Sequence, residues 1–440
     1  MKKFLFLIYL LLTCVVISGC NLTQSESNSD NDYLLLSKKT ETVKLNDQNE
    51  VNNYKNFASL VQGFSTDLLE KTYIKYNSKY DQMVISPLSI YMALAMATGV
   101  GDVEVQEELS NFFGIPYNDI IEYTKYLYSE FVDEKKVDDE IYYKLSLSNS
   151  VWLNESFTYK EEGLELLSKS FYADSYQAPF TTNNKDANKA VRDYVYRNTN
   201  GLIDNDYNFD TATLFLLINT LYFKDKWSQF GDELDLTKLD YDFKNIDNSL
   251  TKTKLMIGHY TLGRAIKANG FEYFYTNTAT STRIYFIKPT TKSLSEVFTK
   301  DNLDQILNNR NYNIYDYDKN EKHATRCLFP QFEATFDEDI VPLLRDEYNL
   351  TKIFKKYNPN FNKLSDEECS VDQIIHQAKL KVNRLGVEGA AVTIVSNEMT
   401  SLPNPEQYIK VYNDFIIDRS FGFVITKYNQ IIFSGVVNSL

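Results

Sequence analysis

The sequence predicts an α+β fold in which helices come first and large, mainly antiparallel sheets follow. Segments in the first half have the three-and-four spacing of amphipathic helices, whereas later segments are apolar and β-branched or aromatic, as in strands. The two kinds of segment do not alternate strictly, which argues against a parallel α/β sheet. Residues 53–440 contain no Pro/Gly/Ser-rich break and no repeat, so we expect a single domain.

Two helices are predicted near the start of this domain. In residues 54–76, apolar side chains recur at spacings of three and four, which predicts a buried face of Phe57, Leu60, Val61, Phe64, Leu68 and Leu69. A second helix is predicted over residues 88–98, because Ser86 can cap its N-terminus and Pro87 fits its first turn.

Strands are predicted from the middle of the chain onward. Residues 145–153 and 213–223 have the composition of central strands. Three closing strands are predicted over residues 409–418, 421–427 and 430–437, the last two joined by a turn at Tyr428 and Asn429.

The first twenty residues predict export and lipid anchoring. Lys2 and Lys3 precede an apolar run over residues 4–17 that is too short to span a membrane comfortably, as in a signal peptide. The run ends in Ser18, Gly19 and Cys20, which resembles a bacterial lipobox. We expect residues 1–19 to be removed and Cys20 to be lipidated; an ordinary secretory signal with an incidental cysteine is the alternative.

Residues 20–52 are predicted to form a flexible tether behind the lipidated cysteine. They are rich in Asn, Asp, Ser, Gln and Lys, with one short apolar patch at residues 33–36. A diacylated cysteine carries two chains, which is enough for stable attachment. The expected location is therefore the bacterial cell surface, as a membrane-anchored extracytoplasmic lipoprotein.

Charge and cysteine content exclude some classes of function. The net charge is −14, and loss of Lys2 and Lys3 with the signal would make it −16. Such an acidic chain disfavours nucleic-acid binding, which needs basic surfaces. Removal of Cys14 and lipidation of Cys20 leave Cys327 and Cys369, which we expect to be buried free thiols rather than a disulfide framework.

The chain carries no recognisable catalytic or metal-binding motif. Its three histidines, His259, His323 and His376, stand in no zinc-protease, triad or nucleophile context, and no phosphate-binding glycine loop occurs. Carboxylates are too numerous to exclude a hydrolase by counting, but none is in a supporting pattern. We therefore expect no enzyme activity, no cofactor and no metal site.

Several short segments, in order along the chain, resemble signatures of the serpin family of serine protease inhibitors. They are residues 84–90 (VISPLSI), 93–96 (ALAM), 198–203 (NTNGLI), 217–227 (LINTLYFKDKW), 328–332 (LFPQF), 375–378 (IHQA), 386–393 (GVEGAAVT) and 433–438 (FSGVVN). Each segment alone is weakly specific, but their number and order cover nearly the whole domain. The resemblance implies the serpin form of the α+β fold, with an exposed reactive loop.

The resemblance also assigns roles to a set of residues in the centre of the fold. Ser86, Ser89, Asn219 and His376 match the polar cluster beneath the sheet whose strands must part, and Trp227 matches the tryptophan where loop insertion begins. The alternatives are four polar residues that are each satisfied locally, and a tryptophan that belongs only to the core.

Serpins inhibit by a trap, in which the protease attacks the loop, forms an acyl-enzyme and is carried away as the loop inserts into the sheet. Insertion requires side chains that alternate between a buried and an exposed face. The segment matching the hinge is Gly386, Val387, Glu388, Gly389, Ala390 and Ala391. With Val387 inward, the inward set continues through Gly389, Ala391, Thr393, Val395, Asn397 and Met399, and both Glu388 and Glu398 point outward.

The family's loop length places the cleaved bond at Thr400-Ser401, with Met399-Thr400 as the alternative. Either bond offers an uncharged residue, which favours elastase-like or subtilisin-like serine proteases as partners. Family inhibitors usually have Thr or Ser at the position of Val387 and Ala at that of Gly389, and these departures leave a non-inhibitory serpin-fold binding module as the alternative. We expect a monomer.

Overall fold

In the computed structural model, the described residues are 33–45, 48–229, 231–355, 360–371, 373–389 and 408–440. Within them the helices are α1 (Gln48–Tyr76), α2 (Pro87–Val100), α3 (Val103–Phe113), α4 (Tyr117–Glu130), α5 (Glu161–Ser170), α6 (Asn184–Asn198), α7 (Leu294–Val297), α8 (Lys300–Asn308) and α9 (Val341–Tyr348), with a 3-10 turn at Asn77–Lys79.

The strands fall mostly in the second half of the chain. They are β1 (Leu34–Ser37), β2 (Gln82–Ile85), β3 (Asp133–Val137), β4 (Glu140–Asn154), β5 (Ala173–Ala178), β6 (Phe215–Lys226), β7 (Tyr241–Lys244), β8 (Leu250–Thr253), β9 (Met256–Ile257), β10 (Thr261–Leu262), β11 (Ile266–Ala268), β12 (Phe271–Asn277), β13 (Arg283–Pro289), β14 (Tyr315–Asp316), β15 (Glu321–Phe329), β16 (Phe332–Asp339), β17 (Ile375–Val382), β18 (Gly386–Gly389), β19 (Ile409–Ile416), β20 (Phe421–Lys427) and β21 (Gln430–Val437).

One large sheet organises the molecule. It has 14 strands in the order β1-β5-β4-β6-β18-β17-β16-β2-β21-β20-β13-β12-β11, with β3 paired to β4. A second sheet forms around β15, which pairs with β9, β10, β14 and β19. Most pairings are antiparallel; β2–β16, β4–β5 and β15–β19 are parallel. The predicted α+β class with mainly antiparallel sheets is therefore confirmed.

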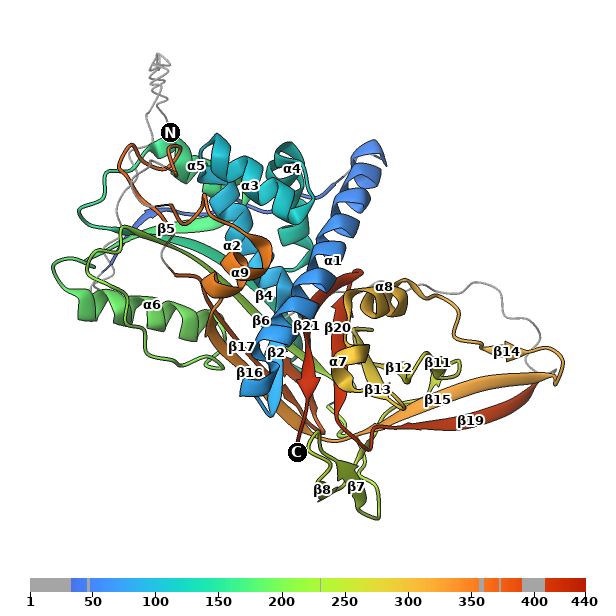
Figure 1. The fold of residues 1–440 in the computed structure, drawn as a ribbon. Helices are drawn as coiled ribbons and strands as arrows, with labels where there is room; N and C mark the ends of the chain where they lie inside the picture. The colour runs from blue at the N-terminus through green and yellow to red at the C-terminus, as the bar shows by residue number, and fades with distance from the viewer. Residues whose placement is uncertain (1–32, 46–47, 230, 356–359, 372, 390–407) are drawn as a thin grey trace, which may run out of the picture.

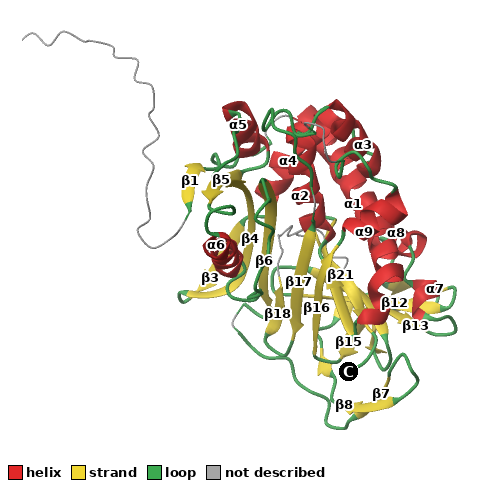
Figure 2. Cartoon of the chain, turned by 60° about the vertical axis from the view of Figure 1, so that its left-hand side comes forward, coloured by secondary structure: helices red, strands yellow, loops and turns green. Residues whose placement is uncertain are grey.

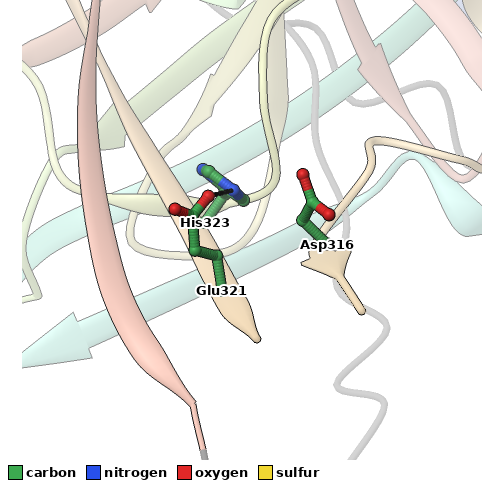
Figure 3. A group of neighbouring side chains, drawn as sticks. All are labelled: Asp316, Glu321 and His323. Atoms are coloured by element: carbon green, nitrogen blue, oxygen red, sulfur yellow. Dashed lines mark ion pairs between the residues drawn. The ribbon is translucent and has the colours of Figure 1, made fainter. Parts of the chain in front are cut away.

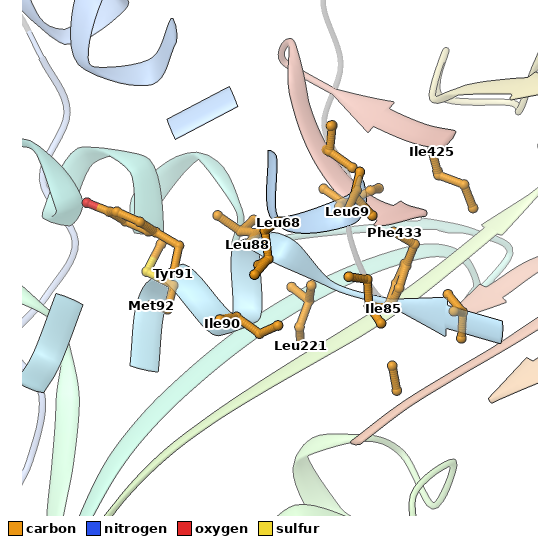
Figure 4. Packing of buried hydrophobic residues seen from close by; sticks show 14 of the residues in the cluster. Leu68, Leu69, Ile85, Leu88, Ile90, Tyr91, Met92, Leu221, Ile425 and Phe433 are labelled. Atoms are coloured by element: carbon orange, nitrogen blue, oxygen red, sulfur yellow. The ribbon is translucent and has the colours of Figure 1, made fainter. Parts of the chain in front are cut away.

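The central strands are covered on both faces, and each cover has its own apolar core. On one face α1 and α2 pack over the sheet, with Leu68, Leu88, Leu221 and Phe433 meeting in the main core (Figure 4). On the other face α6 lies over β4 and β6 and packs around the buried Trp152, apart from the other helices (Figures 1 and 2). Alternation along β4 and β6 supplies both cores.

The predicted elements are found, with shifted boundaries. Helix α1 begins six residues before position 54, and Leu60, expected on its buried face, is 42% exposed because it lies at the edge of the stripe. Ser86 caps α2 by accepting a hydrogen bond from Ser89 N at 3.3 Å, with Pro87 in the first turn. Strands β20 and β21 have the predicted bounds.

The predicted tether is partly wrong. The apolar patch at residues 33–36 lies in and beside β1, which pairs antiparallel with β5 at the edge of the large sheet. Lys39 N donates to Asp174 Oδ1 at 2.9 Å, and Val43 N donates to Tyr172 Oη at 3.1 Å, so the chain stays on the domain beyond the strand. A free sheet edge satisfies backbone groups that the isolated segment would leave to water, which is why composition alone misjudged it.

Candidate functional site: a gap in the central sheet

Residues 386–389 of the predicted hinge already form a strand, β18, in the large sheet. Strand β18 lies between β6 and β17, pairing residues 386–389 with residues 223–226 of β6. On its other side Val387 and Glu388 face Val382 and Lys381 of β17. Since β18 has four residues and its neighbours have 12 and eight, it fills only one end of the space between them.

Beyond the end of β18, the strands on either side of it, β6 and β17, are parted. Within the described residues no ladder joins β6 directly to β17. A cavity of about 920 Å³ begins where β18 ends, between residues 215–222 of β6 and residues 375–379 of β17. Its remaining walls come from α2, from α6 and from the segment that follows α6. Among the described residues, no strand occupies this part of the space between β6 and β17.

The predicted polar cluster lines this cavity. Ser86, Ser89, Asn219 and His376 all belong to the lining, although they come from α2 with its cap, β6 and β17. Ser89 Oγ donates a short hydrogen bond to Asn219 Oδ1, and Ser86 N donates to His376 Nε2 at 3.1 Å. The cluster therefore ties α2 to both strands that border the gap.

The imidazole of His376 is uncharged and accepts a hydrogen bond. Its side chain is buried, and burial lowers the pKa of the imidazole from 6.5 to about 3. Because Nε2 accepts the hydrogen bond from Ser86 N, a proton at Nε2 would remove that bond. The contact between α2 and β17 thus depends on the uncharged ring.

Asn149 of β4 is a member of this cluster that the sequence analysis missed. Asn219 Nδ2 donates to Asn149 Oδ1 at 2.8 Å, and Asn149 Nδ2 donates to Phe171 O at 2.6 Å. The two asparagines stand directly opposite each other in the ladder of β4 and β6. A polar residue in each of two apolar strands was visible in the sequence, but their register was not.

The hinge side chains point in opposite directions. Val387 is buried at 1% exposure, whereas Glu388 is partly exposed and accepts a 2.9 Å hydrogen bond from Tyr222 Oη. Asn200 Nδ2 donates to the same hydroxyl at 3.2 Å. These orientations are those required by the alternation in which Val387 is inward and Glu388 outward.

Trp227 lies beside the start of β18, at the end of that strand away from the cavity. Its Nε1 donates to Asn383 O at 2.7 Å, and its backbone N donates to Leu385 O at 3.2 Å. The Trp227 side chain is buried, with 3% of the residue exposed, and the centroid of its ring lies 5.6 Å from that of the Phe329 ring. Trp227 thus contacts the turn that leads from β17 into the hinge, and it is also part of the core.

A buried charge pair lies beside the hinge, and no motif predicted it. Asp225, paired with Val387 in the ladder, accepts hydrogen bonds from the hydroxyls of Thr278, Thr280 and Thr282. Burial raises the pKa of Asp225 to about 6, and burial lowers the pKa of the nearby Lys427 to about 7. This network ties the end of β6 to the turn between β12 and β13, beside the point where β18 pairs with β6.

The other predicted site residues lie outside the described residues. These are Ala390 and Ala391 of the hinge, Met399, Thr400 and Ser401 at the cleaved bond, and Cys20 at the lipidation site. Cys327 and Cys369 are free and buried, as expected. Among the described residues no helix is long and apolar enough to cross a membrane.

Comparisons with known proteins agree with this geometry. The sequence profile of the family described as "Serpin (serine protease inhibitor)" matches residues 59–440. An uncharacterized serpin-like protein of Methanosarcina mazei is 23% identical over 435 residues, covering 96% of this chain and 97% of its own. Alpha-1-antiproteinase of Rattus norvegicus is 24% identical over 404 residues, covering 89% and 90%.

Solved structures share the fold. The native state of the thermophilic serpin tengpin has a TM-score of 0.69 at 22% identity, covering 93% of this chain and 100% of that one. Cleaved Serpin 42Da also gives a TM-score of 0.69, at 19% identity, covering 88% and 99%.

Proposed function

Because this chain belongs to the serpin family, whose members are protease inhibitors rather than enzymes, we propose that it is a suicide-substrate inhibitor of serine proteases. The observation that carries the proposal is the parted sheet: β18 occupies one end of the gap, and a cavity of about 920 Å³ continues from it between β6 and β17. The cleaved loop would fill this gap as a new strand.

The register of β18 supports insertion of the segment that follows it. Val387 is buried and Glu388 lies outward, so continued alternation would place Gly389, Ala391, Thr393 and Val395 inward. No charged side chain falls on the inward face as far as Met399. A register shift by one residue would bury Glu388 and Glu398 instead, at a high desolvation cost.

The energy available from insertion is adequate for trapping. Roughly a dozen new ladder hydrogen bonds at about 1 kcal/mol net each would release on the order of 10 kcal/mol. This is comparable with the whole stability of a typical domain, about 5–15 kcal/mol. Insertion could therefore deform the active site of a protease held by its acyl bond.

The proposed scissile bond is Thr400–Ser401, with Met399–Thr400 as the alternative. Either bond presents an uncharged side chain to the primary pocket of the protease. Elastase-like and subtilisin-like serine proteases suit such a residue, whereas trypsin-like proteases require a positive charge there.

Incubation of the purified protein with subtilisin-, elastase- and chymotrypsin-like proteases tests the proposal. We expect a denaturant-resistant complex with at least one of them, and a released C-terminal fragment that begins at Ser401 or Thr400. A protease whose active-site serine is blocked beforehand is the control and should form no such complex. Simple loop cleavage by every protease, without complex, would overturn the proposal.

A non-inhibitory serpin-fold binding module is the second candidate, and Val387 and Gly389 are what favour it. Family inhibitors usually carry a hydroxylated residue and an alanine at these positions. Val387 is nonetheless accommodated in β18, at 1% exposure. The double variant Val387→Thr, Gly389→Ala separates the candidates: faster inhibition than wild type supports an inhibitor, and no inhibition by either protein supports the module.

We further propose that the protein acts as a monomer held at a bacterial surface by lipid on Cys20. The support is the sequence pattern of residues 1–20 alone. Labelled fatty acid should be incorporated into the wild-type protein and not into Cys20→Ser, and the variant should leave the membrane fraction. Equal labelling of both proteins would contradict the anchor, and light scattering of the released form would give the oligomeric state.

A further inference from the structure

A cluster of potential metal ligands lies on the hairpin of β14 and β15, far from the gap in the sheet. Asp316 of β14 stands directly across from Glu321 of β15 in the ladder. His323 follows two residues later on β15, and side chains at i and i+2 of a strand share a face. The pairing therefore brings all three to one surface, as Figure 3 shows.

The ligand atoms of these residues are close enough to share one ion. One ligand atom from each lies within 4.8 Å of the others, and His323 Nε2 is 3.1 Å from Glu321 Oε2. Tetrahedral zinc with bonds of about 2.0–2.2 Å requires ligand atoms roughly 3.4 Å apart. A shift of one carboxylate oxygen by up to about 1.4 Å, from 4.8 Å to roughly 3.4 Å, would complete the set.

The buried imidazole of His323 is the second observation that points to a ligand here. The His323 side chain is 95% buried, and its Nε2 makes no hydrogen bond within the described residues, although Glu321 Oε2 lies 3.1 Å away. A buried ring nitrogen without a hydrogen bond is costly unless something else occupies its lone pair. Asp316 Oδ2 accepts a hydrogen bond from Arg264 at 3.1 Å, and Oδ1 accepts one from Lys319 N at 3.3 Å, so Oδ1 keeps a second lone pair for an ion.

We propose that Asp316, Glu321 and His323 form a binding site for a divalent transition metal, with Zn²⁺ preferred. One imidazole and two carboxylates suit zinc, whereas Mg²⁺ and Ca²⁺ prefer an all-oxygen set. The two carboxylates are partly exposed, so a hydrated ion can reach the site and keep water at its remaining position.

A metal at this site would affect the first residues of β19, the strand that follows residues 390–407. Strand β19 begins at Ile409, and its first residues pair with β15 at the proposed ligands: Ile409 faces Glu321 and Val411 faces His323. Asn413 Nδ2 of β19 also lies 3.5 Å from His323 Nδ1. A metal bound here would therefore brace β14, β15 and β19 together, whether or not the protein inhibits proteases.

Titration of the purified, metal-free protein with ZnCl₂ tests the proposal, with calorimetry for affinity and with CoCl₂ for the visible spectrum of the site. We expect saturable binding of one ion, at least about tenfold weaker in His323→Gln and in Asp316→Asn. Two control variants should bind as wild type. His259→Gln alters an exposed histidine between β9 and β10, and Asp318→Asn alters an exposed carboxylate in the turn between β14 and β15.

Hydrogen exchange supplies a second readout that does not depend on affinity. Zn²⁺ should slow exchange in β14, β15 and the first half of β19 of the wild-type protein, and MgCl₂ at the same concentration should not. Absence of saturable zinc binding by wild type would overturn the proposal. Equal binding by wild type, His323→Gln and Asp316→Asn would also overturn it, by placing the ion elsewhere.

Discussion

At the scale of single residues, His376 makes the stability of the folded protein depend on pH. Its pKa is lowered from 6.5 to about 3, so the unfolded chain binds a proton more readily than the folded protein in this interval. The stability contributed by the neutral ring is therefore present above about pH 6.5 and is lost as the pH falls toward about 3. At pH 5 the loss amounts to about 2 kcal/mol.

His376→Gln isolates this contribution, because glutamine can still accept the hydrogen bond from Ser86 N but does not titrate. Denaturation at pH 7.5 and pH 5 should show a smaller loss of stability on acidification in the variant than in the wild type. Asp225 acts in the opposite direction, since its raised pKa contributes stability below about pH 6, so the difference between the proteins is the quantity to compare. His259→Gln should behave as wild type, and an unchanged pH dependence in His376→Gln would contradict the assignment.

Asn219 is the residue on which the polar cluster depends most. Asn219→Ala leaves Ser89 Oγ and Asn149 Oδ1 without the hydrogen bonds they make in the wild type. We expect a loss of about 1–3 kcal/mol in the free energy of unfolding, measured by chemical denaturation. Asn208→Ala, which alters an exposed asparagine at the rim of the same cavity, should change stability little, and equal losses in both variants would argue against the cluster.

Gly386 is required by the close approach of the hinge to β6. A Cβ at this position would lie 2.4 Å from Asp225 O and 2.8 Å from Lys226 Cα, and both are backbone atoms that cannot rotate away. In Gly386→Ala we expect β18 to leave the ladder, so its amides should exchange faster by mass spectrometry. Gly63→Ala in α1 is the control, because open space surrounds its Cβ position; it should leave β18 unchanged and stabilise the helix by about 0.5–1 kcal/mol.

At the scale of elements, β1 shows how an N-terminal segment can complete a sheet edge. The Tyr33 ring lies 5.2 Å from Trp152 and 5.4 Å from Tyr176, and its hydroxyl accepts a 2.7 Å hydrogen bond from Arg197. Tyr33→Ala should lower stability by about 1 kcal/mol or more through lost aromatic contacts.

Tryptophan fluorescence reports this change locally. The chain has two tryptophans, so in a Trp227→Phe background all tryptophan emission comes from Trp152. Tyr33→Ala should shift that emission to longer wavelength, as water gains access to the indole. Unchanged emission together with unchanged stability would mean that β1 contributes nothing to the edge in solution.

How far each element could be predicted follows from the range of the interactions that define it. Strands β20 and β21 were predicted to the residue because their turn residues, Tyr428 and Asn429, lie between two apolar runs and adopt positive φ. Strand β1 needed a partner about 140 residues away, and the pairing of Asn149 with Asn219 spans 70 residues. Such long-range registers leave no local signal, so the sequence predicted β6 as a strand beside the gap but neither β17 nor all of the polar contacts.

At the scale of the whole molecule, the proposed mechanism requires the uncleaved fold to be less stable than one with a complete central strand. Cleavage of the loop by a protease that the protein does not trap should let residues after Gly389 add to β18. The melting temperature of the cleaved protein should then rise by on the order of 10 °C or more, since about 10 kcal/mol of new ladder bonding becomes available.

Two matched variants test whether this rise comes from insertion in the proposed register. Alternation from the buried Val387 puts Ala391 inward and Val392 outward. After cleavage, Val392→Glu should keep more of the rise in melting temperature, because its carboxylate would lie on the same face of the sheet as Glu388. Ala391→Glu should lose it, because insertion would bury an unpaired charge. Equal behaviour of the two variants would contradict the register, and no rise in the wild type would show that the gap does not accept the loop.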